Sequence, residues 1–164
     1  MRFRKNRVYA FLIGLCCLAT AGCLHLGVSH LEKQPWKLET TRTMQMEFMK
    51  FDYEVVPRKD SFGVRGMAYV KKKNVPIWAT WIGELWIQGY LSDQDGAVLA
   101  QGLQVFSPQA LKEGKGIPFD FELKPDSLDS GQLFVSFGYR MSLSKTKDDN
   151  DGPPFMAIER AVSQ

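Results

Sequence analysis

Thiol and imidazole side chains, which carry much nucleophilic and metal chemistry, are confined to the first thirty residues of the chain. All three cysteines, Cys16, Cys17 and Cys23, and both histidines, His25 and His30, lie there. Ser–His–Asp and Cys–His systems need a histidine beside the nucleophile, and zinc sites need several thiolate or imidazole ligands. We therefore expect a non-catalytic protein with no cofactor and no metal, and we assign no catalytic residue.

An acidic run at residues 148–152 is the best remaining candidate for cation binding. Asp149 and Asp151 fit a calcium-loop pattern, and Glu159 stands where that pattern has its bidentate acid. Lys147 occupies the position of the first ligand, where its positive charge opposes a cation. We expect a solvated loop, with calcium as the alternative. Paired carboxylates for glycoside hydrolysis stay open, because the fold decides which acids meet.

Large side chains recur on one side of the strand predicted at residues 78–91. Trp78, Ile82, Trp86 and Tyr90 occupy even positions, although the odd positions already form a credible core face. A strand with one solvated face should be polar on that face. The four residues form either a partner-binding stripe, since Trp and Tyr dominate binding hot spots, or a glycan-stacking surface. In the other interpretation the strand is central and is covered by the preceding tether or the C-terminal segment.

The elements that would position these residues start with an export signal. Basic residues between Arg2 and Arg7 precede an apolar run at residues 8–18, and small residues follow at 19–22. This layout is typical of a secretory signal peptide. The apolar run is too short for a membrane-spanning helix, which needs ~20 residues. We expect residues 1–22 to be a signal helix that is removed on export.

The end of this signal, Thr20-Ala21-Gly22-Cys23, resembles the lipobox of bacterial lipoproteins. The resemblance implies cleavage before Cys23, a diacylglyceryl group on its sulfur and a further acyl chain on its new amino group. Several acyl chains make attachment to membrane lipid stable. Leu24 stands where the family's inner-membrane retention signal has Asp, which implies the outer membrane and a periplasm-facing protein. The alternative is an uncleaved anchor or a plain secretory signal.

The charge balance argues against nucleic acid as a partner. The chain has 21 basic and 18 acidic residues, but four basic residues and no acid lie within residues 1–22. The remainder holds 17 basic and 18 acidic residues and has a net charge of −1, so no net basic footprint is left. The run Lys71-Lys72-Lys73 fits a solvated hairpin end or, as the alternative, a lipid head-group contact.

The rest of the sequence alternates as antiparallel strands do. At residues 133–143, apolar side chains at odd positions alternate with mostly polar ones. Asp95-Gly96 is typical of a hairpin turn, and Ser, Pro and Gly at residues 107–114 favour a helical turn. We predict a lipidated tether at residues 23–42. Residues 43–164 are predicted to form an all-β, immunoglobulin-like antiparallel sandwich of about seven strands.

Three stretches resemble the FxLYD-type immunoglobulin-like modules of bacterial envelope proteins. They are Phe62-Gly63-Val64-Arg65-Gly66 with the later Asn74, the strand–Asp-Gly–strand segment at 85–98, and residues 111–119. The resemblance covers about sixty residues and implies binding or scaffolding rather than a common catalytic site.

These observations predict a lipid-anchored envelope protein that acts as a non-catalytic binding or assembly accessory, with another envelope protein as its partner. The alternative is a carbohydrate-binding or carbohydrate-processing domain that uses Trp78, Trp86 and nearby acids. A purely structural envelope protein without a specific ligand is the third hypothesis.

Overall fold

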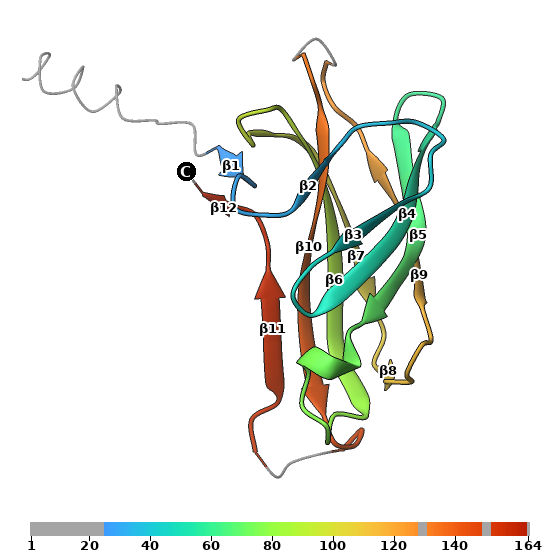
Figure 1. The fold of residues 1–164 in the computed structure, drawn as a ribbon, viewed down its shortest axis with the longest axis vertical. Coiled ribbons are helices and arrows are strands. Elements are labelled where there is room, and N and C mark those ends of the chain that lie inside the picture. The colour runs from blue at the N-terminus through green and yellow to red at the C-terminus, as the bar shows by residue number, and fades with distance from the viewer. Residues whose placement is uncertain (1–24, 128–130, 149–151, 164) are drawn as a thin grey trace, which may run out of the picture.

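The computed structural model describes residues 25–127, 131–148 and 152–163, which form two antiparallel sheets packed face to face (Figure 1). The larger sheet has the order β11 (Phe155–Glu159), β10 (Phe134–Ser144), β6 (Trp81–Ser92) and β7 (Val98–Phe106), and β2 (Lys33–Pro35) and β8 (Gln109–Ala110) pair with β10 and β6. The smaller sheet has the order β3 (Arg42–Gln45), β4 (Met49–Pro57), β5 (Phe62–Val70) and β9 (Ile117–Leu123). A ribbon of β1 (Leu26–Gly27) and β12 (Val162–Ser163) and the short 3-10 helix η1 (Lys72–Asn74) complete the described fold.

The predicted all-β sandwich is confirmed. Seven of the described strands, β4, β5, β6, β7, β9, β10 and β11, contain five or more residues. In β9, buried and exposed residues alternate without interruption, as expected for a strand with one face in the core. No helix among the described residues is long and apolar enough to cross a membrane.

Aromatic side chains join the two sheets. Phe137 of β10 stacks on Phe51 of β4, with ring centroids 4.5 Å apart. The rings of Tyr53 and Phe119 pack edge-on against Phe137 at 4.9 and 5.6 Å. Such pairs add ~0.5–1.5 kcal/mol each beyond the burial of their area, so Phe137 lies at the centre of the contact that holds both sheets.

A β-bulge in β6 changes which of its residues face this core. Glu84 lies opposite Ser142, whereas Ile82 lies opposite Leu143, so Gly83 has no partner in β10. An extra residue of this kind shifts the side-chain alternation by one position. Ile82 therefore points into the core together with the odd-numbered residues that follow it, and it is 1% exposed.

Residues 25–42, expected as a tether, belong to the folded structure instead. β1 pairs with β12, and β2 pairs with residues 134–136 of β10, beyond the part that β11 covers. Between these strands, Val28 and Leu31 are buried. The packing has two physical causes: apolar side chains gain by leaving water, and the edge of β10 offers backbone groups to pair with. Cys23 and the signal at residues 1–22 lie outside the described residues.

Two turn predictions have different outcomes. The helical turn expected at residues 107–114 is wrong, because this stretch contains β8, which pairs with Trp81 and Ile82 at the start of β6. The Asp-Gly hairpin turn is confirmed. Asp93 Oδ1 accepts the N–H groups of Asp95 and Ala97, both at 2.9 Å, and Gly96 has the positive φ of +86° that such a turn requires.

Candidate functional site

The outer face of the larger sheet, which points away from the smaller sheet, carries exposed apolar side chains. Val105 of β7 lies opposite Trp86 of β6. Trp86 lies opposite Arg140 of β10, which in turn lies opposite Ile158 of β11. Leu103 of β7 and Met156 of β11 come two residues before Val105 and Ile158, so their side chains lie on the same face. The apolar residues of this surface, called the apolar face below, are Trp86, Leu103, Val105, Met156 and Ile158.

The apolar face is unusual for strand positions that point to solvent. Each of its five residues is between 36% and 59% exposed, although the solvated side of an antiparallel sheet is normally polar. Paired strands lie ~4.8 Å apart, so these side chains form a surface that crosses the sheet from β7 to β11. Arg140 lies between the apolar residues of β6 and β7 and those of β11. Apolar residues gathered on one side of a sheet mark an interaction site more often than isolated ones do.

Arg140 orients the indole ring of Trp86. Its guanidinium lies over that ring, 5.7 Å from the centroid, and Arg140 Nε donates a hydrogen bond to Glu84 Oε2 at 3.2 Å. An exposed ion pair adds little to stability. Here it holds the Trp86 side chain in one orientation, which reduces the entropy lost when a partner covers the ring.

The four residues of the predicted stripe do not meet on one exposed face. Trp78 is 39% exposed but lies in the loop before β6, and Ile82 is in the core because of the bulge at Gly83. Tyr90 is on the outer face but only 1% exposed. Of the four, Trp86 alone is both exposed and part of the sheet.

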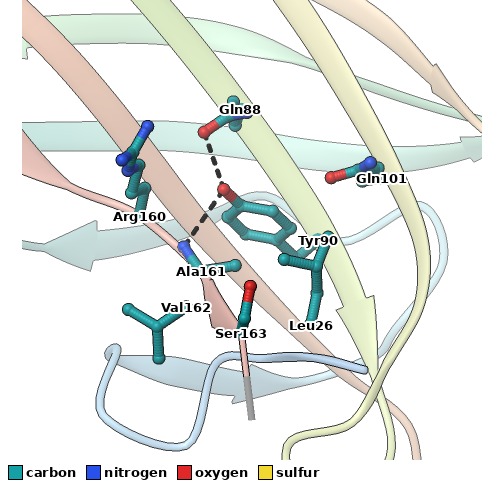
Figure 2. A pocket seen from close by; sticks show the side chains of 8 residues that line it. All are labelled: Leu26, Gln88, Tyr90, Gln101, Arg160, Ala161, Val162 and Ser163. Atoms are coloured by element: carbon teal, nitrogen blue, oxygen red, sulfur yellow. Dashed lines mark hydrogen bonds between the residues drawn. The ribbon is translucent and has the colours of Figure 1, made fainter. Parts of the chain in front are cut away.

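Both ends of the folded chain cover Tyr90 (Figure 2). Its hydroxyl donates to Gln88 Oε1 at 2.7 Å and accepts the N–H of Ala161 at 3.2 Å. Residues of β1 and β12 line the same pocket, which measures about 400 Å³ and includes Gln101 and Arg160. Burial raises the pKa of the Tyr90 hydroxyl, although the Ala161 N–H and the Arg160 charge oppose this. The folded N-terminal segment and the C-terminal segment therefore cover this half of β6, as the other interpretation of the strand expected.

The sequence pattern does not single out four residues of the apolar face, Leu103, Val105, Met156 and Ile158. Alternation predicts β7 and β11 as strands, but it does not say which side of either strand faces out. A weak signal was present, because β7 has no charged residue over its whole length, which is uncommon for a strand with a free edge.

Neither metal-binding groups nor similar proteins indicate what the apolar face binds. Among the described residues, no three His, Cys, Asp or Glu side chains are grouped so that they could hold a metal ion. Asp149 and Asp151 of the predicted calcium loop lie outside those residues. No protein-family model, curated protein or solved structure matches the chain.

Proposed function

We propose that this protein is a lipid-anchored, periplasm-facing accessory of the cell envelope that binds a protein partner through the apolar face and catalyses no reaction. The observation that carries the proposal is the exposure of five apolar side chains on one side of the larger sheet. Covering them removes apolar surface from water, which is the main driving force of protein association.

The composition of the apolar face supports a protein as the partner. Trp and Arg are the residue types most enriched at the centres of protein interfaces, and Trp86 and Arg140 lie side by side near the middle of the face. Arg140 covers one side of the indole ring at 5.7 Å. That side is thereby less available for stacking a sugar, so the arrangement favours a protein over a glycan.

A second candidate function, glycan binding, is favoured by the pocket next to the apolar face. Gln88, Gln101 and Arg160 line this pocket, and amide and guanidinium groups are donors that sugar hydroxyls can use. Tryptophan fluorescence measured during titration with glycan fragments separates the two functions. A saturable shift supports the glycan function, whereas a flat titration removes it.

The proposed anchor is Cys23, two residues before the first described residue. Metabolic labelling with palmitate tests it directly. We expect label in the wild-type chain and none in the Cys23→Ala variant, because the acylated sulfur is then missing. Label that persists in Cys23→Ala would contradict the anchor while leaving the proposed role of the apolar face intact.

Docking is tested by crosslinking in cells followed by affinity capture of the chain, with expression levels matched. We expect one discrete partner with the wild-type chain and loss of that partner with Trp86→Ser. Arg65→Ser is the matched control, because Arg65 is an exposed strand residue on the opposite outer face. Equal capture by all three chains, or capture by none, would contradict the proposal.

A further inference from the structure

The loop between β5 and β6, residues 71–80 and called the distal loop below, lies at the opposite end of the sandwich from the β1–β12 ribbon (Figure 1). It contains the most exposed large apolar side chain among the described residues, Ile77, which is 97% exposed. The next residue, Trp78, is 39% exposed. An aliphatic and an aromatic side chain side by side in water both gain when another phase covers them.

Hydrogen bonds hold the distal loop in its conformation. Lys72 Nζ donates to the carbonyl oxygen of Ala79 at 2.6 Å, and the Ala79 N–H donates to the carbonyl of Pro76 at 3.0 Å. The Thr80 N–H donates to the carbonyl of Ser144 in β10 at 3.1 Å. The exposure of the two apolar side chains is therefore set by the fold.

Lysines are numerous in the distal loop and in the loop next to it. Residues 71–73 are all lysine, and Lys112 and Lys115 lie in the adjacent loop, where they line one small cleft with the last residue of β5. Residues 71–80 and 111–116 together hold five lysines and one acid, Glu113, for a net charge of +4. Residues 145–151, which follow β10, hold two lysines and three aspartates. The distal loop and the loop that follows β8 are therefore both net positive in sequence.

We propose that the distal loop binds an anionic lipid surface. Ile77 and Trp78 enter the head-group region, where tryptophan is enriched in membrane proteins. Lys73, Lys112 and Lys115 contact lipid phosphates, whereas the ammonium groups of Lys71 and Lys72 donate to backbone carbonyls of the protein itself. Buried apolar area and attraction to anionic lipids act together in interfacial binding, and basic residues near an anionic membrane strengthen it. The distal loop is separate from the apolar face, so this inference does not depend on partner docking.

The position of the distal loop adds a consequence that rests on the proposed lipid anchor. β6 runs from the distal loop to the hairpin beside β1, because Gly27 forms a bridge with Ala97 at that end. Its 12 residues at ~3.3 Å each separate the two ends by ~40 Å. A chain anchored by lipid at one end and bound to lipid at the other bridges two lipid surfaces.

Vesicle clustering tests this inference with the full chain purified from membranes in detergent. The chain is loaded into phosphatidylcholine vesicles and mixed with dye-labelled vesicles, made either of phosphatidylcholine alone or with phosphatidylglycerol added. We expect clustering, measured by light scattering, only with the anionic vesicles. The Ile77→Ser/Trp78→Ser double variant should cluster them about tenfold less, because the inserted apolar area is lost. Leu38→Ser is the matched control, because Leu38 is an exposed apolar residue outside both the distal loop and the apolar face, and it should cluster them as the wild type does.

Three results would overturn the inference. Equal clustering of neutral and anionic vesicles would remove the role of the lysines. Unchanged clustering by the double variant would mean adsorption by charge alone, as to any anionic polymer, without insertion of the loop. A chain that does not load into the first vesicles contradicts the anchor; its flotation with anionic vesicles alone is then measured, and failure to float would contradict lipid binding by the loop itself.

Discussion

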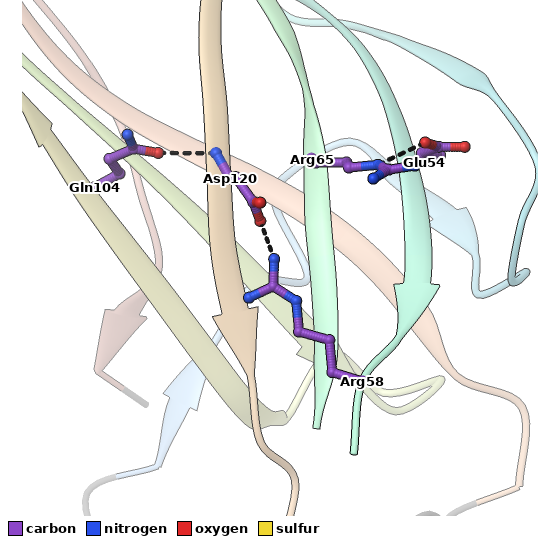
Figure 3. A network of polar contacts seen from close by, with 5 residues as sticks. All are labelled: Glu54, Arg58, Arg65, Gln104 and Asp120. Carbon is purple, nitrogen blue, oxygen red and sulfur yellow. Dashed lines mark hydrogen bonds and ion pairs between the residues drawn. The ribbon is translucent and has the colours of Figure 1, made fainter. Parts of the chain in front are cut away.

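Across the outer face of the smaller sheet, Glu54, Arg65 and Asp120 lie opposite one another on β4, β5 and β9. Arg65 Nε donates to Glu54 Oε1 at 2.7 Å, and Arg58 forms an ion pair with Asp120 (Figure 3). The Asp120 N–H also donates to Gln104 Oε1 at 2.9 Å. The corresponding line of paired residues across the larger sheet runs over four strands. Three of its members are apolar, and the fourth is Arg140; the apolar ones are Val105, Trp86 and Ile158.

This contrast separates the demands of folding from those of binding. Both rows occupy outward positions of antiparallel strands on one shared core, so packing does not require apolar residues in either. Paired charges keep the smaller sheet soluble at little cost in stability. Exposed apolar residues at the same kind of position on the larger sheet are a liability for solubility. We infer that a partner covers the larger sheet in the working protein and that water covers the smaller one.

The largest effect is expected where the two sheets meet, because both outer faces depend on that contact. Phe137→Ala should lower the free energy of unfolding by ~3–5 kcal/mol, since the Phe137 ring is fully buried and stacks on Phe51 at 4.5 Å. Urea unfolding followed by circular dichroism measures this loss. A change below ~1 kcal/mol, less than a buried aromatic truncation normally costs, would mean that the two faces do not share one core.

Alkaline pH tests the same core without changing its volume. Burial raises the pKa of Tyr53 from 10.0 to about 12, with the Arg42 charge opposing the shift. A raised pKa stabilises the fold fully below the unfolded value, and that stability is lost as pH rises from 10 toward 12. Unfolding free energies measured across this range should fall less steeply in Tyr53→Phe. Identical slopes in the two proteins would contradict the assignment.

On the outer face of the larger sheet, the chain ends cover the part around Tyr90 and leave the part around Trp86 exposed. These two parts should respond differently to mutation. Tyr90→Phe removes the acceptor of the Ala161 N–H and the donor to Gln88, which should cost ~1–3 kcal/mol. Amide hydrogen exchange at residues 161–163 should become faster. Trp86→Ser, in the exposed part of the face, should leave the exchange at residues 161–163 unchanged. Equally faster exchange in both variants would contradict the difference between the two parts.

Replacing exposed apolar residues should change the surface without changing the fold. The Leu103→Thr/Val105→Thr double variant keeps residue types suited to strands, and surface substitutions of this kind shift stability by within ~0.5 kcal/mol each. Binding of a hydrophobic fluorescent dye should decrease, whereas Arg65→Thr on the smaller sheet should not decrease it. Dye binding that is unaffected by the double variant would show that the apolar face is not the accessible apolar surface.

The smallest effect is expected on the charged face. A double-mutant cycle with Glu54→Gln and Arg65→Gln should give a coupling energy of ~0.2–1 kcal/mol, because the pair is partly exposed. This coupling should decrease as salt is added. A coupling well above that range would mean that the charged face contributes to folding as strongly as a buried network.

Local alternation in the sequence predicts most of the strands, and pairing between distant segments decides the site. The pattern at residues 133–143 identifies β10 unaided. Ile82 was expected to face outward, but its orientation depends on a bulge defined by pairing with Leu143, about sixty residues later. The cover of Tyr90 depends in the same way on Ala161, 71 residues away. The apolar face requires the registers of four strands, which no single segment encodes.

We propose that the larger sheet, and not the smaller one, meets the partner. A photo-crosslinking amino acid placed at Val105 or at Glu122 in the full chain tests it in cells; both positions are exposed strand residues, on opposite outer faces. We predict a discrete crosslinked adduct from Val105 and none from Glu122. An adduct from Glu122 without one from Val105, or no adduct from either position, would contradict the claim.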